Sequence, residues 1–181
     1  MNKKTVGDKM MLEHGDICIR CIEDTDLEFV SFCSSPMVYG TYQGFRFTSQ
    51  NALLNAYQED GFWSADGGIL LVEDQGEAVG LAQITFVREG LVRVGLILLP
   101  DNRGAGIGTA VLGMLRDYLC ENYPIARIEA DTDVVNIAGQ RILENNGFAC
   151  EGTLRAYSFY GGAYHDSYVY SYITNLGRCS L

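Results

Sequence analysis

The chain contains little proline, little histidine and few basic residues. Only 3 of its 181 residues are proline and 2 are histidine, and 23 acidic residues outnumber 13 lysines and arginines. The net charge of −10 argues against nucleic-acid binding, which relies on a basic surface stripe. Because His14 and His165 lie far apart in the sequence, we predict no histidine-based metal site and no metal cofactor.

Long apolar runs are also missing. No run reaches the roughly 18 residues of a membrane-spanning helix, and the N-terminal lysines are not followed by the apolar segment of a signal peptide. The six cysteines show no zinc-site spacing, since the alternating sequence CICIRC points Cys18 and Cys21 to opposite faces of a strand. We therefore expect a cytoplasmic protein with reduced thiols and no membrane partner.

What is present is the composition of an ordinary globular protein, with 48% apolar and 20% charged residues. A chain of this length buries enough surface to need no cross-links, and we predict one domain over residues 1–181. The acidity mildly favours a cationic ligand such as an amine, and solubility alone also explains it.

The order of apolar patterns predicts an α+β fold with a mostly antiparallel sheet. Alternation and turn residues predict strands over 16–22, 68–74, 77–89, 91–100, 126–132, 148–160 and 163–173. Helical spacing and capping residues predict helices over 24–35, 50–60, 108–121 and 137–146, with an aromatic-rich loop over 36–47. Gly147 is expected to be a left-handed residue after its helix, and Gly161 and Gly162 predict a tight hairpin turn.

The segment LILLPDNRGAGIGTAVLGML, residues 96–115, joins a strand to a helix through glycines at every second position. A glycine-rich turn at a helix N-terminus binds anions, because unsatisfied N–H groups point at the ligand. A P-loop is excluded, since Thr109 follows the last glycine where lysine is required. A dinucleotide-binding turn stays as an alternative, although its G-x-G-x-x-G pattern fails from Gly104 and from Gly106.

The hexapeptide RGAGIG resembles the [RQ]-x-x-G-x-[GA] pyrophosphate loop of the GNAT superfamily of acyl-CoA N-acyltransferases. The segment NIAGQRILENNGF, from Asn136 to Phe148, resembles the second signature of that family, with Gly139 at a small-residue position. The C-terminal run resembles the branch that acetylates N-terminal amines of ribosomal proteins, through Gly147, Phe148, Glu151, Gly152, Arg155, Gly162 and Asp166. This resemblance implies a GNAT-like, mixed, mostly antiparallel twisted sheet with helices on both faces.

The resemblance also implies acetyl-CoA as co-substrate. The residues that it implies for holding acetyl-CoA are Leu96, Ile97, Leu98, Arg103, Gly104, Ala105, Gly106, Ile107, Gly108, Thr109 and Asn136. Free backbone groups at 96–98 would pair with the pantetheine arm, and the amides of 103–109 would cradle the pyrophosphate. Asn136 has a second explanation, because capping its own helix is a sufficient role.

Acetyl transfer to an amine needs a base for the ammonium proton, a donor for the oxyanion and a proton for the thiolate. Glu129 and Asp131 share one face of the strand over 126–132, and each is either the base or a structural hydrogen-bonding partner. Leu143 stands where many GNAT enzymes have a tyrosine acid. Four tyrosines share one face of the strand over 163–173. One of them acts as a substitute acid, or all of them are packing residues: Tyr164, Tyr168, Tyr170 and Tyr172.

Aromatic residues gather where the resemblance implies the acceptor pocket. They bind an amine by cation–π contact or form a small hydrophobic cluster, and they include Tyr39, Tyr42, Phe45, Phe47, Phe62 and Trp63. The sequence thus predicts an acetyl-CoA-dependent N-acetyltransferase that uses direct transfer in a ternary complex. Its acceptor is a primary amine, on a small molecule or at a peptide or protein N-terminus. The alternative is a non-catalytic GNAT-fold protein that binds or senses acyl-CoA, and a homodimer is possible in either case.

Overall fold

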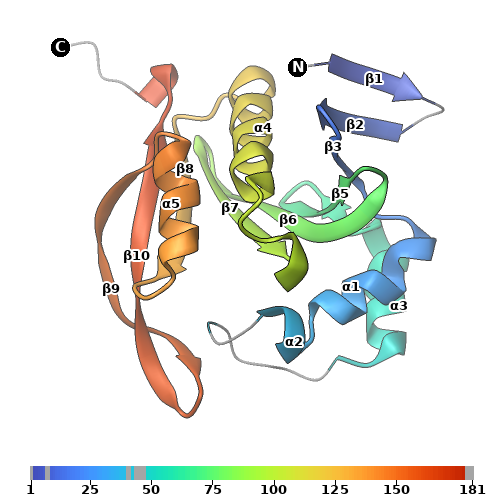
Figure 1. The fold of residues 1–181 in the computed structure, drawn as a ribbon. Coiled ribbons are helices and arrows are strands. Elements are labelled where there is room, and N and C mark those ends of the chain that lie inside the picture. Colours follow the sequence, from blue (N-terminus) through green and yellow to red (C-terminus); the bar gives the residue numbers. More distant parts are fainter. Residues whose placement is uncertain (1, 7–8, 40–41, 43–47, 178–181) are drawn as a thin grey trace.

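The structure, a computed structural model, describes residues 2–6, 9–39, 42 and 48–177 (Figure 1). Within these residues ten strands form one sheet in the order β1-β2-β3-β5-β6-β7-β8-β10-β9, and β4 pairs with β5 outside this path. Neighbouring strands are antiparallel except β7 and β8, which are parallel. The predicted mixed, mostly antiparallel sheet is therefore confirmed.

The strands are β1 (Asn2–Val6), β2 (Lys9–His14), β3 (Ile17–Cys21), β4 (Trp63–Ser64), β5 (Gly67–Asp74), β6 (Glu77–Arg88), β7 (Leu91–Leu98), β8 (Arg127–Asp133), β9 (Ala149–Tyr160) and β10 (Ala163–Ile173). The helices are α1 (Leu27–Cys33), α2 (Pro36–Tyr39), α3 (Gln50–Asp60), α4 (Ile107–Asn122) and α5 (Ile137–Asn145). Short 3-10 turns are η1 (Asp24–Asp26), η2 (Pro100–Asn102) and η3 (Asn175–Gly177).

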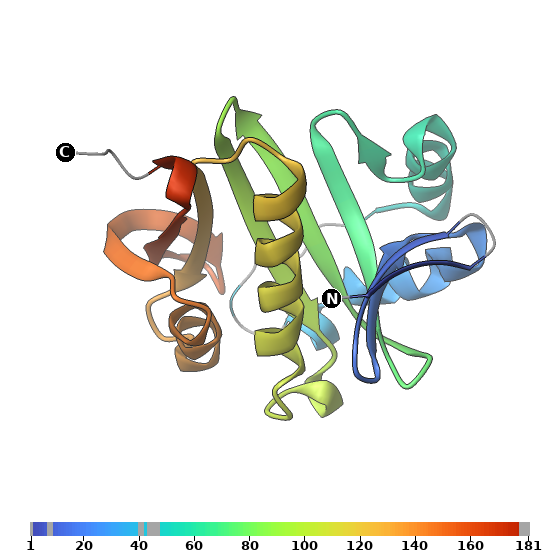
Figure 2. The ribbon, with the colours of Figure 1, turned by 90° about the horizontal axis from the view of Figure 1, so that it is seen from above.

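Helices cover both faces of the sheet, as predicted. Helices α4 and α5 lie on one face, and α1, α2 and α3 lie on the other (Figures 1 and 2). Successive side chains of a strand point to opposite faces of the sheet and so enter both cores. Leu70 and Val72 of β5 belong to the core beneath α4, and Leu71 belongs to the core beneath α1–α3. Two apolar clusters on opposite faces therefore hold the sheet between its helices.

Several elements have the bounds or the special residues that the local sequence predicts. Helix α3 has the predicted bounds, and the Ser49 hydroxyl accepts a hydrogen bond from the Ala52 amide at 3.2 Å, as an N-cap does. The predicted apolar face of α4 is buried along its length, from Ile107 to Tyr118. Gly147 has a φ of 79° directly after α5, and both Gly161 and Gly162 have positive φ in the hairpin turn, so these predictions are confirmed.

The structure differs from the sequence-based expectations at three places. The N-terminal hairpin of β1 and β2 was not expected, because its sequence NKKTV carries no apolar alternation. Helix α2 occupies the start of the predicted loop over 36–47, with Pro36 in the first-turn position that proline tolerates. The helix predicted over 24–35 begins as the 3-10 turn η1, whose N-cap is Glu23, and Asp26 reaches back to accept from the Glu23 amide at 2.8 Å.

Candidate active site

The two parallel strands separate after a short contact. Pairing of β7 with β8 ends at Arg93 and Glu129, while β7 continues to pair with β6 up to Leu98. The next residues on the face that bears Arg93 and Glu129 are Gly95 and Asp131, one from each strand. Gly95 is exposed and has no side chain, and a Cβ placed there would make an ordinary contact with Gln83 at 3.7 Å, so β7 presents no side chain at the level where the strands diverge.

The backbone amides and carbonyls of successive β7 residues point alternately toward β6 and toward the gap where β8 separates from β7. The amide of Leu99 bonds the carbonyl of Val79 at 2.9 Å, which makes Leu98 and Gly80 a non-hydrogen-bonded pair in the antiparallel ladder. The amides and carbonyls of Leu96 and Leu98 therefore point away from β6, and those of Ile97 point toward it. The expectation of free backbone groups at Ile97 is corrected accordingly, and a strand-like contact with a ligand is confined to Leu96 and Leu98.

The glycine-rich loop needs its glycines for two different reasons. Gly104 and Gly106 adopt φ values of 82° and 86°, which side-chain-bearing residues rarely adopt, and the space where a Cβ would lie is open at both. Gly108 has an ordinary φ, but a Cβ there would lie 2.6 Å from the Ile142 side chain of α5. The loop thus exposes backbone at the α4 N-terminus, where unsatisfied N–H groups and the helix dipole suit a pyrophosphate.

The side chain of Asn146, the C-cap of α5, fixes the first turn of α4. The buried Asn146 amide donates to the carbonyls of Thr109 and Ile142 at 3.0 and 2.9 Å. At the other end of α5, Asn136 accepts from the Gly139 amide at 3.1 Å and donates to the Thr132 hydroxyl at 3.0 Å. Both polar atoms of Asn136 are therefore used within the fold, so its cap role is observed and its contact with acetyl-CoA stays a prediction.

The two candidate bases on β8 have different surroundings. Glu129 accepts from Arg127 at 2.7 Å and from Arg93 at 3.4 Å, so it is held in an ion-pair network. Asp131 is half-buried, and burial raises the pKa of its carboxyl group against the opposing effects of Arg93 and of a hydrogen bond from Tyr157. Within the part of the chain that the structure describes, Asp131 forms no ion pair, and a carboxylate with a raised pKa is the better proton acceptor of the two.

Tyrosines of β9 reach over β10 to the carboxylates of β8. The Tyr157 hydroxyl donates to Asp131 at 3.5 Å, and the Tyr160 hydroxyl donates to the buried Asp133 at 2.5 Å. Burial, the Asp133 hydrogen bond and nearby Tyr42 raise the pKa of Tyr160 to about 12. These two tyrosines were not among the sequence-based candidates.

A bulge in β9 explains how Tyr157 turns toward β8. Ala156 has a φ of 52°, and its amide donates to the Asp166 carboxylate at 2.8 Å. The register of the hairpin shifts between His165 and Ser167 at the same level. Asp166, singled out in the sequence for its family pattern, therefore shapes the hairpin.

Other predicted aromatic residues divide between two places. Trp63 packs against the core cluster beneath α4, and Tyr42 lies near enough to Tyr160 to affect the pKa of its phenol. Phe45 and Phe47 lie outside the described residues, as does the side chain of Tyr39. Of the predicted substrate residues, Tyr42 is thus the one that lies near the Asp133–Tyr160 pair.

The tyrosines of β10 pack rather than line the divergence. Tyr168, Tyr170 and Tyr172 belong to the core beneath α4 and α5, and the Tyr170 hydroxyl donates to Glu144 at 3.1 Å. Tyr164 is 68% exposed and stacks edge-on against Phe159. Leu143 is buried in the same core, so the position of the family's tyrosine acid carries packing instead.

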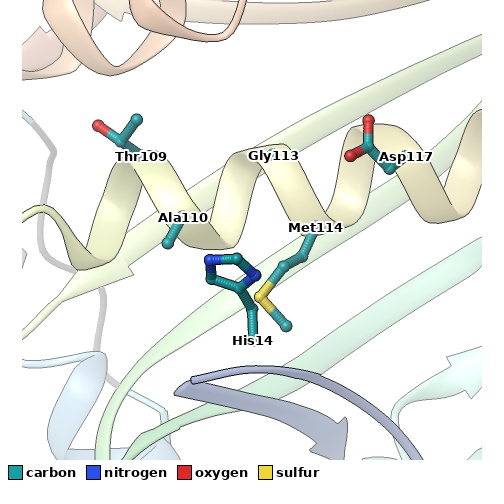
Figure 3. A pocket seen from close by; sticks show the side chains of 6 residues that line it. All are labelled: His14, Thr109, Ala110, Gly113, Met114 and Asp117. Atoms are coloured by element: carbon teal, nitrogen blue, oxygen red, sulfur yellow. The ribbon is translucent and has the colours of Figure 1, made fainter. Parts of the chain in front are cut away.

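A separate hollow of about 210 Å³ lies between α4 and His14 at the end of β2. Figure 3 shows the His14 ring of β2 beside Ala110 and Met114, with Asp117 further along the helix. Thr109 lines this hollow and also belongs to the predicted pyrophosphate loop. Among the described residues, no helix is long and apolar enough to cross a membrane, and no metal-ligating cluster forms.

The divergent strands, the exposed glycine loop and the helix N-terminus agree with the family that the sequence resembles. The chain belongs to the GNAT acetyltransferase family, because a model described as an acetyltransferase (GNAT) domain matches residues 16–149. A comparison with curated protein sequences gives no match.

Solved structures of the same fold include three acetyltransferases. RimL, a ribosomal L7/L12 alpha-N-protein acetyltransferase in complex with coenzyme A, has 18% identity and a TM-score of 0.77 over 92% of this chain and 99% of that one. A spermidine N-acetyltransferase from Vibrio cholerae, in complex with CoA and spermine, has 20% identity and a TM-score of 0.78 over 88% and 96%. A ribosomal-protein-S5-alanine acetyltransferase from Vibrio fischeri has 18% identity and a TM-score of 0.75 over 92% and 97%.

Proposed function

We propose that this protein transfers the acetyl group of acetyl-CoA to a primary amine by direct transfer in a ternary complex, with Asp131 as the base. The observation that carries the proposal is the position of Asp131. Its half-buried carboxylate lies on β8 just past the point where β7 and β8 separate, opposite the exposed Gly95. Catalysis is favoured over binding alone because a cradle that only binds acyl-CoA needs no such carboxylate.

The residues around the α4 N-terminus fit acetyl-CoA. The backbone from Arg103 to Thr109 would hold the pyrophosphate, since Gly104 and Gly106 keep the loop open and free of side chains. Leu96 would pair its amide and carbonyl with the pantetheine arm, in the manner of an added strand. The thioester supplies an activated acetyl group at the end of this arm.

Asp131 accepts a proton from the ammonium group of the acceptor, and Tyr157 keeps the carboxylate oriented through its hydroxyl. The neutral amine then forms a C–N bond with the thioester carbonyl carbon, and the C–S bond breaks. The Leu98 amide, which points toward the divergence, donates to the oxyanion that develops. The second proton of the nitrogen moves to the departing sulfur, so the products are an acetamide and free CoA thiol.

Direct transfer agrees with the state of four of the six thiols. Burial raises the pKa of Cys33 to about 12 and that of Cys18 to about 11. Burial also raises the pKa of Cys21 and of Cys120. A thiol that stays protonated is a poor nucleophile, so these four residues are unsuited to an acetyl-enzyme intermediate.

The acceptor would approach from the face of the sheet that bears Asp131, where Asp133, Tyr160 and Tyr42 lie further along. Carboxylates and phenols on this face suit a cation, and the net charge of −10 raises the local concentration of amines. The amines of peptide N-termini and of polyamines are the first candidates, because the solved neighbours named above are acetyltransferases of these two kinds. The cytoplasmic location, the single domain and the homodimer stay predictions.

The test combines binding with turnover. Acetyl-CoA at 100 times its Kd should stabilise the fold by about 2.7 kcal/mol. A panel of N-terminal peptides, polyamines and aminoglycosides should then release free thiol with one class of amine. Stabilisation without thiol release from any amine would favour the alternative of an acyl-CoA binder, and no stabilisation would contradict the proposed function.

A further inference from the structure

The side chain of Arg103, the first residue of the glycine loop, binds two backbone carbonyls of this chain. Its Nε and Nη2 atoms donate to the Leu98 carbonyl at 3.0 and 2.9 Å, and Nη2 also donates to the Val38 carbonyl. The guanidinium group thus joins the end of β7 to α2, two segments that are about 60 positions apart in sequence.

Both carbonyls are at positions that need a partner. Leu98 ends β7 and turns its carbonyl away from β6, on the side from which β8 has already departed. Val38 lies in the last turn of α2, a one-turn helix whose carbonyls lack intrahelical partners. A cation is also favourable at a helix C-terminus, where the backbone dipoles leave partial negative charge.

The arrangement connects the two substrate sides of the site. The backbone of Arg103 begins the loop that would cradle the pyrophosphate, and its side chain holds α2. The segment after α2 leads to Tyr42, which lies near Tyr160 on the acceptor face. Val38 is fully buried, so a shift of its carbonyl moves the rest of this short helix with it.

We infer that Arg103 is a positioning residue that couples the acyl-CoA loop to α2 and to the acceptor side of the site. The inference rests on the proposed function, because it requires acyl-CoA in the glycine loop. Filling the loop fixes the backbone of Arg103, and the guanidinium group then fixes α2. Arg103 is therefore expected to act on α2 through its side chain and on the phosphates through its backbone.

Hydrogen exchange with and without CoA tests the coupling in the full-length protein. In the wild type, CoA should slow exchange at least about fivefold both in the loop over 104–110 and in the segment over 34–39. Arg103→Lys keeps the charge but loses the planar fork that reaches two carbonyls. In this variant the loop should keep its protection, the segment over 34–39 should lose it, and the Kd for CoA should change by less than about threefold.

Two comparisons sharpen the result. Arg103→Gln keeps an amide donor without the charge, and it too should keep the protection of the loop and lose the protection of the segment over 34–39. A melting curve checks that each variant is folded. Arg88→Lys is the matched control, since Arg88 is an exposed arginine of β6 at the opposite end of the β6–β7 pairing from Leu98, and it should leave both protections unchanged.

Each outcome decides the inference. Protection of both segments in Arg103→Lys would overturn it, because α2 would then respond to CoA without the guanidinium fork. A loss of CoA affinity of more than about tenfold would overturn it in favour of a direct contact between Arg103 and phosphate. Absence of protection in the wild-type loop would overturn the proposed function together with the inference.

Discussion

The two halves of the candidate site are built from different parts of the polypeptide. The proposed acyl-CoA half, from Leu96 to Thr109, consists of backbone groups that Gly104 and Gly106 leave free of side chains. The acceptor half consists of side chains that β8 and β9 bring together across β10, such as Asp131 with Tyr157. Backbone recognition depends on local conformation, whereas the acceptor half depends on long-range packing, so substitutions should separate binding from chemistry.

The largest effect is expected from Asp131→Asn. Loss of the base should lower kcat by about 100-fold or more, because an amide cannot take the ammonium proton. Thiol release at saturating acetyl-CoA measures this change. In the wild type, the acid limb of kcat/KM should lie above the ordinary range of a carboxyl group, because burial raises the pKa of Asp131.

The same substitution should not weaken the fold. Because the folded-state pKa of Asp131 is raised, its contribution favours the folded state below the unfolded pKa and is lost as pH rises through the folded pKa. At neutral pH the buried charge therefore opposes folding, and Asp131→Asn should melt at or above the wild-type temperature. A lower melting temperature would assign Asp131 a structural role.

The next effect concerns the loop. Gly106→Val forces a β-branched residue to a φ of 86°, at a cost of the order of 1–3 kcal/mol, and should weaken acetyl-CoA binding at least about tenfold. Calorimetric titration measures the Kd. The matched control is Gly76→Val, which places the same strain in the β5–β6 turn at a φ of 83°. Equal affinity loss in both variants would show that global strain, rather than the cradle, is responsible.

A smaller effect is expected from filling the space opposite Asp131. A Cβ at Gly95 would lie 3.7 Å from the Gln83 Cβ, an ordinary contact, so the fold should accept Gly95→Ala and Gly95→Leu. The longer side chain should raise the KM for the acceptor about tenfold and leave acetyl-CoA affinity unchanged. Steady-state kinetics with both substrates varied measures the two constants. An unchanged acceptor KM in Gly95→Leu would place the acceptor elsewhere.

The smallest effect is expected at Glu151 of β9, a carboxylate that stabilises the fold and has no proposed role in catalysis. Hydrogen bonds from Arg127 and then Ser171 lower the pKa of Glu151 to about 2. Its stabilisation is therefore present above the unfolded pKa near 4.5 and is lost as pH falls toward 2. Glu151→Gln should cost at most about 1 kcal/mol at neutral pH, as exposed ion pairs do. Melting curves from pH 7 to pH 2.5 should show the two proteins converging, and a constant difference would contradict this role.

The difference between the halves also explains what the sequence could predict. The strand, glycine turn and helix of residues 96–122 are encoded by neighbouring residues, and apolar spacing located α4 to within a residue at each end. The direction of the Ile97 backbone was misjudged because it depends on the register with β6. Local sequence carries no such register.

The acceptor half was predicted only in part. The alternation of β8 placed Glu129 and Asp131 on one face, but the ion pair of Glu129 with Arg93 requires the parallel pairing of β7 with β8. The contact of Tyr157 with Asp131 requires the bulge at Ala156, which a residue ten positions later in the chain holds in place. Asp166 was the residue in the sequence that could have indicated the bulge, since a carboxylate shortly after a tight turn can accept a hydrogen bond from a bulged amide of the preceding strand.

Calorimetric titration of acetyl-CoA into the Asp131→Asn variant tests the separation of the two halves most directly. The expected result is a Kd within about threefold of the wild-type value, together with loss of thiol release in the same sample. A Kd weakened by about tenfold or more would contradict it, because the carboxylate of Asp131 would then belong to the acyl-CoA half rather than to the acceptor half.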